Sequence, residues 1–512
     1  MYGGLKKACN TVYWQHKLSI IIIPYCLAFG ITSAVAEEIK SNQTEAELDE
    51  LLQGFDDKPA VSNEPNLEEL LDGFDDNATP SKQDENLDQL ISGFEEAETT
   101  SPESLEETAS KPWYFTTLTS LSSAYNYQHT KPAQGKADFR GLSRLKFKIQ
   151  PELRYQINSH WDSVLSASAF YDLAYRIQGR SQYEKSLINS NESEAELREF
   201  YVRGTLTDNF DIKIGRQIVV WGKSDSIRVV DIVNPLDFRE PGMVDIEDLR
   251  LPVTMLKADY YFGDWNLSTI IIPEIRFNKT PAFGSDFNPS QNRPAPEQTP
   301  DSIKNPELAI ALNGVFSGWD LSFHAAKFYD DQAHSVLVNG ATNHLSHSQL
   351  HMLGAATNIA LSHWLFKSEF AWIDGLEFAN STNSFSRNDL MIGVDYAGIT
   401  NMTFSVEFAN RHINNYKDAL KNRPDQTERN SGQFAFRYSA SFLREKLEVV
   451  ALASILGTDL SNGAFYRGSL EYEIQDAMTI LVGAIVYQAG DEGLLNKIAK
   501  NDRIFFDWRY TF

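Results

Sequence analysis

The sequence predicts an all-β fold: a transmembrane antiparallel β-barrel of about 18 strands (about 16–20), preceded by a disordered acidic periplasmic segment. Three observations support this fold class. Long segments alternate between apolar and polar residues, and short and long connections alternate between those segments. The chain also ends on one more alternating strand, RIFFDWRYTF at 503–512. The chain of 512 residues is 42% hydrophobic, which permits a large core, but it is too polar for a bundle of membrane helices.

The N-terminus has the pattern of an export signal. Lysines precede the apolar run LSIIIIPYCLAFGI at 18–31, and small residues follow up to Ala36. This arrangement predicts a secretory signal peptide over residues 1–36. An uncleaved anchor is the alternative, although Pro24 interrupts the apolar run.

Residues 37–110 form an acidic segment with 23 Asp and Glu against three Lys. Such a segment should not fold alone. It contains three similar repeats, LDELLQGFDD (48–57), LEELLDGFDD (67–76) and LDQLISGFEE (87–96). Each repeat places apolar residues at i, i+3, i+4 and i+7, which predicts a two-turn helix that forms on docking to a partner. A solvated spacer is the alternative. The partner-docking residues are Leu48, Leu51, Leu52, Phe55, Leu67, Leu70, Leu71, Phe74, Leu87, Leu90, Ile91 and Phe94.

Residues 111–512 are predicted to form the barrel. The clearest strand runs from 144 to 157, where apolar residues alternate strictly with Arg, Lys, Glu and Gln. Strands of soluble sheets average about 5–6 residues, whereas a tilted membrane strand needs about 9–11. The length of this segment therefore favours a membrane strand.

The spacing of turns gives a second signal. Short turns are expected at NSHW, TDNF, FGDW, SGWD, LSHW, AGITN, LREK and QDAM, and longer connections lie between them. Eight short turns and nine long loops connect 18 strands, with both chain ends on the short-turn side.

The last strand resembles the C-terminal signature of Gram-negative outer-membrane barrels. In those proteins the barrel-insertion machinery reads a terminal Phe and the alternating apolar residues before it. Phe506, Trp508, Tyr510 and Phe512 match this insertion signal. The resemblance implies that the barrel lies in the outer membrane and contacts its lipid, with the N-terminal tail in the periplasm.

A narrower resemblance lies in IGRQIVVWGKSDSIRVVDIVNPLDFREP at 214–241. It resembles a family of large outer-membrane barrels of unknown function that share a GRQxxxWG strand end and an NPxD loop. Members of that family tend to accompany exporters of the resistance-nodulation-division type, which implies a role in envelope transport. The matching residues are Gly215, Arg216, Gln217, Trp221, Gly222, Asn234, Pro235 and Asp237.

A barrel of this size encloses more space than its own side chains fill. A basic wall and an acidic loop at 223–251 would set opposite charges across a constriction if the loop folds inward. The alternative is that the basic residues only keep a water-lined wall solvated. Because Gly215 could mark a bulge, the sequence leaves open which face carries Arg216. The pore-lining candidates are Arg144, Lys146, Lys148, Arg154, Arg203, Lys213, Asp231, Asp237 and Glu240.

Other chemistry has little support. Both cysteines, Cys9 and Cys26, lie in the signal peptide, so the mature chain is expected to have no disulfide and no cysteine nucleophile. We find no nucleophile motif, phosphate loop or nucleotide fingerprint, and no cofactor or enzymatic activity is expected. The net charge of -24 argues against nucleic acid. His344, His347 and His351 would share a face if they were helical, and they are weak candidates for a metal site.

The sequence thus predicts an outer-membrane channel or a component of a transport system, with a periplasmic tail that recruits a periplasmic or exporter protein. A non-conducting structural or assembly barrel is the alternative. A barrel enzyme or metal receptor is the third hypothesis.

Overall fold

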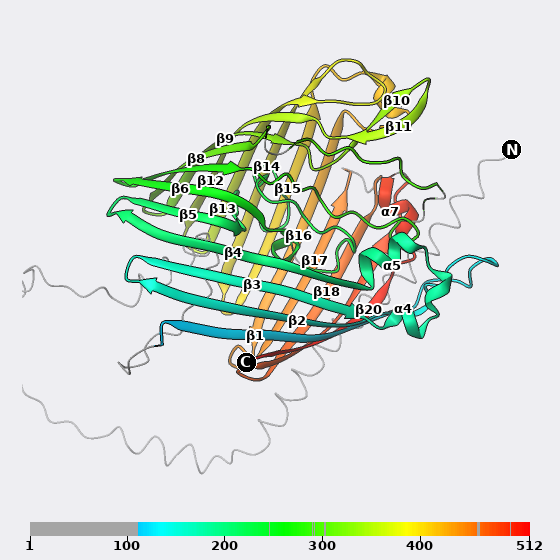
Figure 1. Ribbon diagram of the computed structural model, residues 1–512, viewed down its shortest axis with the longest axis horizontal. Coiled ribbons are helices and arrows are strands. Elements are labelled where there is room, and N and C mark those ends of the chain that lie inside the picture. The colour runs from blue at the N-terminus through cyan, green and yellow to red at the C-terminus, as the bar shows by residue number, and fades with distance from the viewer. Residues whose placement is uncertain are drawn as a thin grey trace, which may run out of the picture. The chain divides into compact units, whose positions relative to one another are not determined.

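The structure is a computed structural model that describes residues 111–512, apart from positions 245, 289, 291, 302–303, 458–460 and 492. The signal peptide at 1–36 and the three repeats therefore lie outside the described residues. Within the described range, eighteen antiparallel strands form one sheet, which closes through the pairing of β1 with β20 (Figure 1). The predicted fold class is therefore confirmed: the chain forms a transmembrane antiparallel barrel.

The elements run in chain order as follows: β1 (Trp113–Asn126), β2 (Gly141–Asn158), β3 (Trp161–Asp172), α4 (Ala174–Ile177), η2 (Arg180–Gln182), α5 (Lys185–Asn191), β4 (Ser193–Thr207), β5 (Phe210–Gln217), α6 (Ile246–Leu249), β6 (Val253–Phe262), β7 (Trp265–Ile272), β8 (Glu307–Phe316), β9 (Trp319–Tyr329), β10 (His334–Val338), β11 (Ala341–Ser346), β12 (Gln349–Leu361), β13 (Trp364–Leu376), β14 (Phe385–Ile399), β15 (Met402–Ile413), η3 (Asp418–Lys421), β16 (Asn430–Phe442), β17 (Leu447–Leu456), β18 (Ala464–Gln475), β19 (Met478–Gln488), α7 (Gly493–Ile498) and β20 (Arg503–Thr511). Strands β10 and β11 form a separate hairpin.

The period-two pattern of the strands sorts side chains between the two faces of the wall. On β2, Phe147 is 47% exposed and Ile149 is 38% exposed on the outer face, whereas Arg144, on the inner face, is buried. On β20, Phe505 is buried inside, and the rings of Trp508 and Tyr510 stack 6.2 Å apart on the outer face. This alternation gives the barrel an apolar exterior and a polar interior.

The predicted rhythm of connections is also present. Eight short turns and nine longer connections join the barrel strands, and the predicted short turns fall between strands. The start of β1 pairs with the end of β2 near one such turn, and Phe512 bonds to Thr117 at the same end. Helices α4, α5 and α7 lie at the opposite, long-loop end (Figure 1). Within the described residues, no helix is long and apolar enough to cross a membrane.

Candidate functional site

The connection between β5 and β6, residues 218–252, folds into the barrel, and we call it the inward loop. Its side chains of Val219, Trp221 and Val230 are 3%, 6% and 0% exposed, and they belong to a core that includes Ala371 of β13. Small inward-facing residues leave room for the loop, so the loop is packed as part of the protein interior.

One end of the inward loop is bound to β13 and β15 by two buried carboxylates. Glu369 accepts the backbone N–H groups of Ser224 at 2.9 Å and Val230 at 3.1 Å. Glu407 accepts the N–H of Asp225 at 2.9 Å. Both glutamates are 1% exposed. Backbone donors that would otherwise be orphaned inside the barrel thus find carboxyl oxygens as acceptors.

The residues of the sequence motif build this anchor. Gly222 has φ +96°, and a Cβ there would lie 2.9 Å from the Glu369 carboxylate, so a larger residue would collide with the anchor. The ring of Trp221 lies 4.7 Å from that of His324. Asn234, fully buried, accepts the N–H of Val219 at 2.8 Å and thereby closes the loop on itself.

The inward loop also reaches the opposite wall. Glu240 forms ion pairs with Arg144 and with Lys146, the latter at 3.8 Å, and both partners lie on β2. The hydroxyl of Tyr487 on β19 donates to the Pro241 carbonyl at 2.5 Å. In the ring of strands, β2 lies half a circumference from β13. The loop therefore crosses the lumen.

The charge of Glu240 is set by this contact. Burial raises the pKa of its carboxyl group, but the nearby cations Arg144, Lys146 and Arg503 outweigh burial and lower the pKa to about 2. Glu240 is therefore an anion facing the basic side chains of Arg144 and Lys146 on β2.

The remaining basic candidates face the lumen: three lie near the short turns, and Lys148 lies near the middle of β2. Two of them pair with neighbouring carboxylates, and a third lies over a tyrosine ring. The contacts are Arg154–Glu152 at 2.7 Å, Arg203–Asp162 at 2.7 Å and Lys213 Nζ to the Tyr201 centroid at 4.0 Å, and Lys148 continues the inward row of β2.

Two acidic candidates pair with cations of the inward loop itself. Asp231 is 4% exposed and is held by Arg250 at 3.0 Å and Arg228 at 3.3 Å, so it stabilises the loop interior instead of lining a pore. Asp237 binds the side chain of Arg239, with Nε at 2.9 Å. Of the three acidic candidates, Glu240 is the one that contacts the basic wall.

The histidine candidates are not on a helix, so the geometric premise of a metal site is wrong. His344 lies in β11 and His351 in β12, and His347 lies between these strands. The His347 ring stacks on Phe277, and its Nε2 lies 2.9 Å from Glu297. In the part of the chain that the structure describes, no group of three or more His, Cys, Asp or Glu residues could hold a metal ion.

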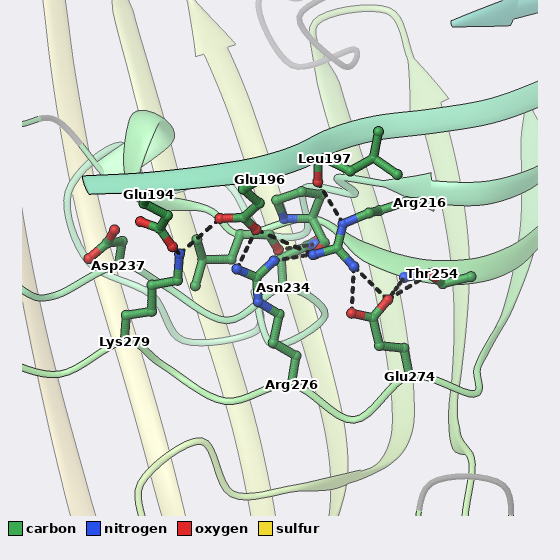
Figure 2. Close-up of polar contacts among 12 residues, drawn as sticks. Glu194, Glu196, Leu197, Arg216, Asn234, Asp237, Thr254, Glu274, Arg276 and Lys279 are labelled. Carbon is green, nitrogen blue, oxygen red and sulfur yellow. Dashed lines mark hydrogen bonds and ion pairs between the residues drawn. The ribbon is translucent and has the colours of Figure 1, made fainter. Parts of the chain in front are cut away.

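A second polar cluster closes an incomplete stretch of the wall. The β3–β4 ladder continues to the Tyr171–Ser193 pair, whereas the β4–β5 ladder ends at Phe200–Arg216. The exposed edge of β4 is covered by charged side chains, as Figure 2 shows. Several come from residues 273–306, the connection between β7 and β8, which we call the second loop. We name the cluster the ionic seam, and its members are Glu194, Glu196, Arg216, Glu274, Arg276 and Lys279.

Arg216 is the centre of the ionic seam. Its Nε donates to the Leu197 carbonyl at 2.9 Å, its Nη2 pairs with Glu196 at 3.3 Å, and its Nη1 pairs with Glu274 at 2.5 Å (Figure 2). The guanidinium thus replaces a missing backbone partner of β4 and links the strand to the second loop.

The facing of Arg216, which the sequence leaves open, follows from the strand register. Neither ladder of β5 shifts at Gly215, so Arg216 stays on the outer face with Ile214, which is 50% exposed. Gly215 has φ +133°, and a Cβ there would lie 2.1 Å from the Phe200 carbonyl oxygen. The glycine therefore permits close approach of β4 without a bulge.

Sequence reasoning does not identify the partners of the inward loop or of the ionic seam. One available signal is an acidic residue on the inward face of an apolar strand, as for Glu369 in WLFKSEFAWI and Glu407 in MTFSVEFANRHI. A second is the alternation of Glu274, Arg276 and Asn278 directly after the end of β7.

Some solved structures are similar to this chain. OccAB2 of Acinetobacter baumannii aligns with a TM-score of 0.47 and 10% identity, over 78% of this chain and 98% of that chain. OccK5 (OpdH) of Pseudomonas aeruginosa gives 0.45 and 11%, over 78% and 98%. OmpF of Salmonella typhi, in complex with daunomycin, gives 0.40 and 10%, over 78% and 97%.

No curated protein matches the sequence significantly. A family model does match: the one described as "Protein of unknown function (DUF1302)" covers residues 98–512, most of the chain. The chain therefore belongs to the DUF1302 family.

Proposed function

We propose that this protein is an outer-membrane channel whose aqueous path passes the inward loop, and that it serves as the outer-membrane component of a transport system. The observation that carries the proposal is the inward loop itself, which joins Glu369 on one wall to Arg144 on the other. An 18-strand barrel is wider than its own side chains need, and a loop bound to both walls narrows that space to a charged passage.

The closed β-barrel with a lipid-facing exterior supports the outer-membrane location, since barrels of this type span outer membranes. The lumen of such barrels is polar, and the inward Arg, Lys, Asp and Glu residues of β2–β5 are suited to charged solutes in water. The proposal requires no chemical step.

Planar-bilayer recording tests this proposal. The purified full-length chain should give a stepwise conductance, and replacing residues 223–232 with a short Gly-Ser linker should increase it because the linker lacks the anchored segment. A barrel that does not conduct, with or without the replacement, would instead support the non-conducting structural or assembly role.

The acidic segment 37–110 provides the partner site in this proposal. The chain enters the barrel at the short-turn end, which faces the periplasm in outer-membrane barrels. On docking, each repeat would bury four apolar side chains, at about 1.5–3 kcal/mol each, but would have to order about ten residues at about 1–2 kcal/mol each. One repeat should therefore bind weakly, and three tethered repeats should gain avidity on an oligomeric exporter protein.

A pull-down with residues 37–110 as bait tests this part. Changing Phe55, Phe74 and Phe94 together to Ala should abolish partner recovery while barrel insertion stays intact, and single changes should weaken recovery in part. If deletion of residues 40–108 leaves partner recovery and transport unchanged, the segment is a spacer.

A further inference from the structure

Glu274 of the second loop occupies a cluster of hydrogen-bond donors in the wall, where β4 and β5 no longer pair. One carboxylate oxygen accepts the Thr254 backbone N–H at 2.8 Å and the Thr254 hydroxyl at 2.6 Å. The same oxygen lies 2.6 Å from Nη1 of Arg216. A cation and two neutral donors around one carboxylate are the features of an oxyanion site.

These donors belong to the wall, whereas the carboxylate belongs to a loop. Arg216 and Thr254 are directly paired in the β5–β6 ladder. The β6–β7 ladder ends at the Leu256–Ile271 pair, so the Thr254 N–H relies on Glu274 for an acceptor. The hydrogen-bond donors are therefore fixed by strands, and the carboxylate that accepts from them belongs to a loop.

The site faces outward, next to lipid-facing side chains. Thr254 is exposed, whereas its chain neighbours Val253 and Met255 face the core and are only 2% and 1% exposed. One step along the same outer face lie Ile214 and Ile271, 50% and 38% exposed. Alternation therefore places the polar donors at the edge of the apolar exterior.

Phe200 completes the apolar side of this site. It is the register partner of Arg216 on β4 and is 54% exposed. A charged group on the lipid face is costly at mid-depth and much less costly near the membrane interface. Arg216 lies at the long-loop end of β5, where interfacial head groups are found, so its position suits contact with a head group.

We propose that Arg216 and Thr254 form a binding site for the head group of an anionic amphiphile, whose apolar chain lies along Phe200, Ile214 and Ile271. The ligand carries a carboxylate or phosphate on an apolar chain. Glu274 is the internal placeholder that the head group displaces, and the exchange preserves every hydrogen bond of the donors. The site lies outside the lumen and does not depend on conduction through the channel.

The test uses the full-length chain in phosphatidylcholine nanodiscs with a doxyl-labelled stearate, and its methyl ester as the uncharged probe. Electron paramagnetic resonance reports the immobilised fraction of each probe. The acid should show a saturable immobilised component that the ester lacks. If Glu274 fills the donors nine-tenths of the time, Glu274→Gln should lower the half-saturating concentration about tenfold.

Donor variants complete the design. Arg216→Gln and Thr254→Val should weaken binding of the acid, whereas Glu297→Gln and Arg293→Gln, in the second loop but outside the donor cluster, should leave it unchanged. Heat-dependent gel migration reports folding. If Arg216→Gln does not fold, the binding curves of Thr254→Val and Glu274→Gln test the proposal.

Two further arms identify the source of the ligand. Competition by phosphatidylglycerol in the nanodisc indicates a resident lipid, and competition by added decanoate indicates an amphiphile arriving from water. Equal immobilisation of acid and ester in all variants would overturn the proposal, as would identical saturation curves for wild type, Glu274→Gln and Thr254→Val.

Discussion

The inward loop is held at the wall of β13–β15, and the second loop is held at the wall of β4–β6. Carboxylates make both attachments, but the surroundings of these carboxylates differ. Glu369 and Glu407 are 1% exposed, and they accept backbone N–H groups. In the ionic seam, the side chains of Glu194, Glu196 and Glu274 are 26%, 17% and 31% exposed, and most of their partners are side-chain cations.

This difference separates a fixed contact from one that can exchange. Removing a buried acceptor leaves backbone donors unsatisfied, because no water replaces it, whereas partly hydrated ion pairs add little net free energy and can be replaced by water or ligand. We therefore expect the β13–β15 contacts to fix the shape of the constriction and the ionic seam to be the part of the wall that rearranges.

The largest effect is expected for Glu369→Ala. The N–H groups of Lys223, Ser224 and Val230 would lose their acceptor, at about 1–3 kcal/mol for each unsatisfied donor. The inward loop should detach while the barrel stays folded, so limited proteolysis within 218–252 should become faster and conductance should rise. Glu445→Ala, in an exposed short turn, serves as the control. A proteolysis rate equal to wild type would show that Glu369 does not anchor the loop.

A smaller effect on the same contact is expected for Gly222→Ala. The new methyl group would meet the Glu369 carboxylate in a backbone conformation that L-residues disfavour by about 1–2 kcal/mol. Gly340→Ala is a matched control, because Gly340 has φ +78° and a Cβ added there would have no heavy atom within 4 Å. Gly222→Ala should accelerate proteolysis of the loop more than Gly340→Ala. Equal proteolysis rates for the two variants would mean that the contact with Glu369 adds nothing to the effect of backbone strain.

The sequence predicts the parts of this comparison that depend on local pattern. Strands and turns could be located because their signals, such as the alternation over 144–157 and the turn residues of FGDW, depend on only a few neighbouring positions. The contacts of the inward loop could not be predicted, because Val230 and Glu369 are 139 residues apart and meet only when the barrel closes. Asp231 shows the same limit: its acidity is visible in the sequence, but its burial against Arg250 depends on how the loop folds.

A moderate effect is expected at the point where the inward loop meets β2. Glu240→Gln would remove the counter-charge of Arg144 and Lys146, so ion selectivity should shift toward anions, measured as a changed reversal potential in a salt gradient. Asp301→Asn, in an exposed pair with Lys304, is the control. An unchanged reversal potential would place Glu240 outside the conducting path.

The pH dependence of wild type sharpens this prediction. The pKa of Glu240 is lowered to about 2, because the adjacent cations outweigh the effect of burial. A depressed carboxyl pKa means that the stabilising charge is fully present above the ordinary value of about 4.5 and is lost only as pH falls through the folded value. Wild type should therefore keep the contribution of Glu240 to selectivity at pH 4. A loss of that contribution between pH 6 and pH 4 would contradict the assigned pair.

The smallest effect is expected in the ionic seam, for Lys279→Met. The Lys279 ammonium pairs with Glu194 and with Glu196, the latter at 2.8 Å, but its side chain is 22% exposed. Partly hydrated ion pairs contribute about 0–1 kcal/mol and are screened by salt. The urea midpoint should therefore fall slightly at low ionic strength and match wild type at high salt, and Lys304→Met should show no change at either. A large loss of stability that persists in high salt would mean that the seam is as rigid as the β13–β15 anchor, and the contrast between the two walls would not hold.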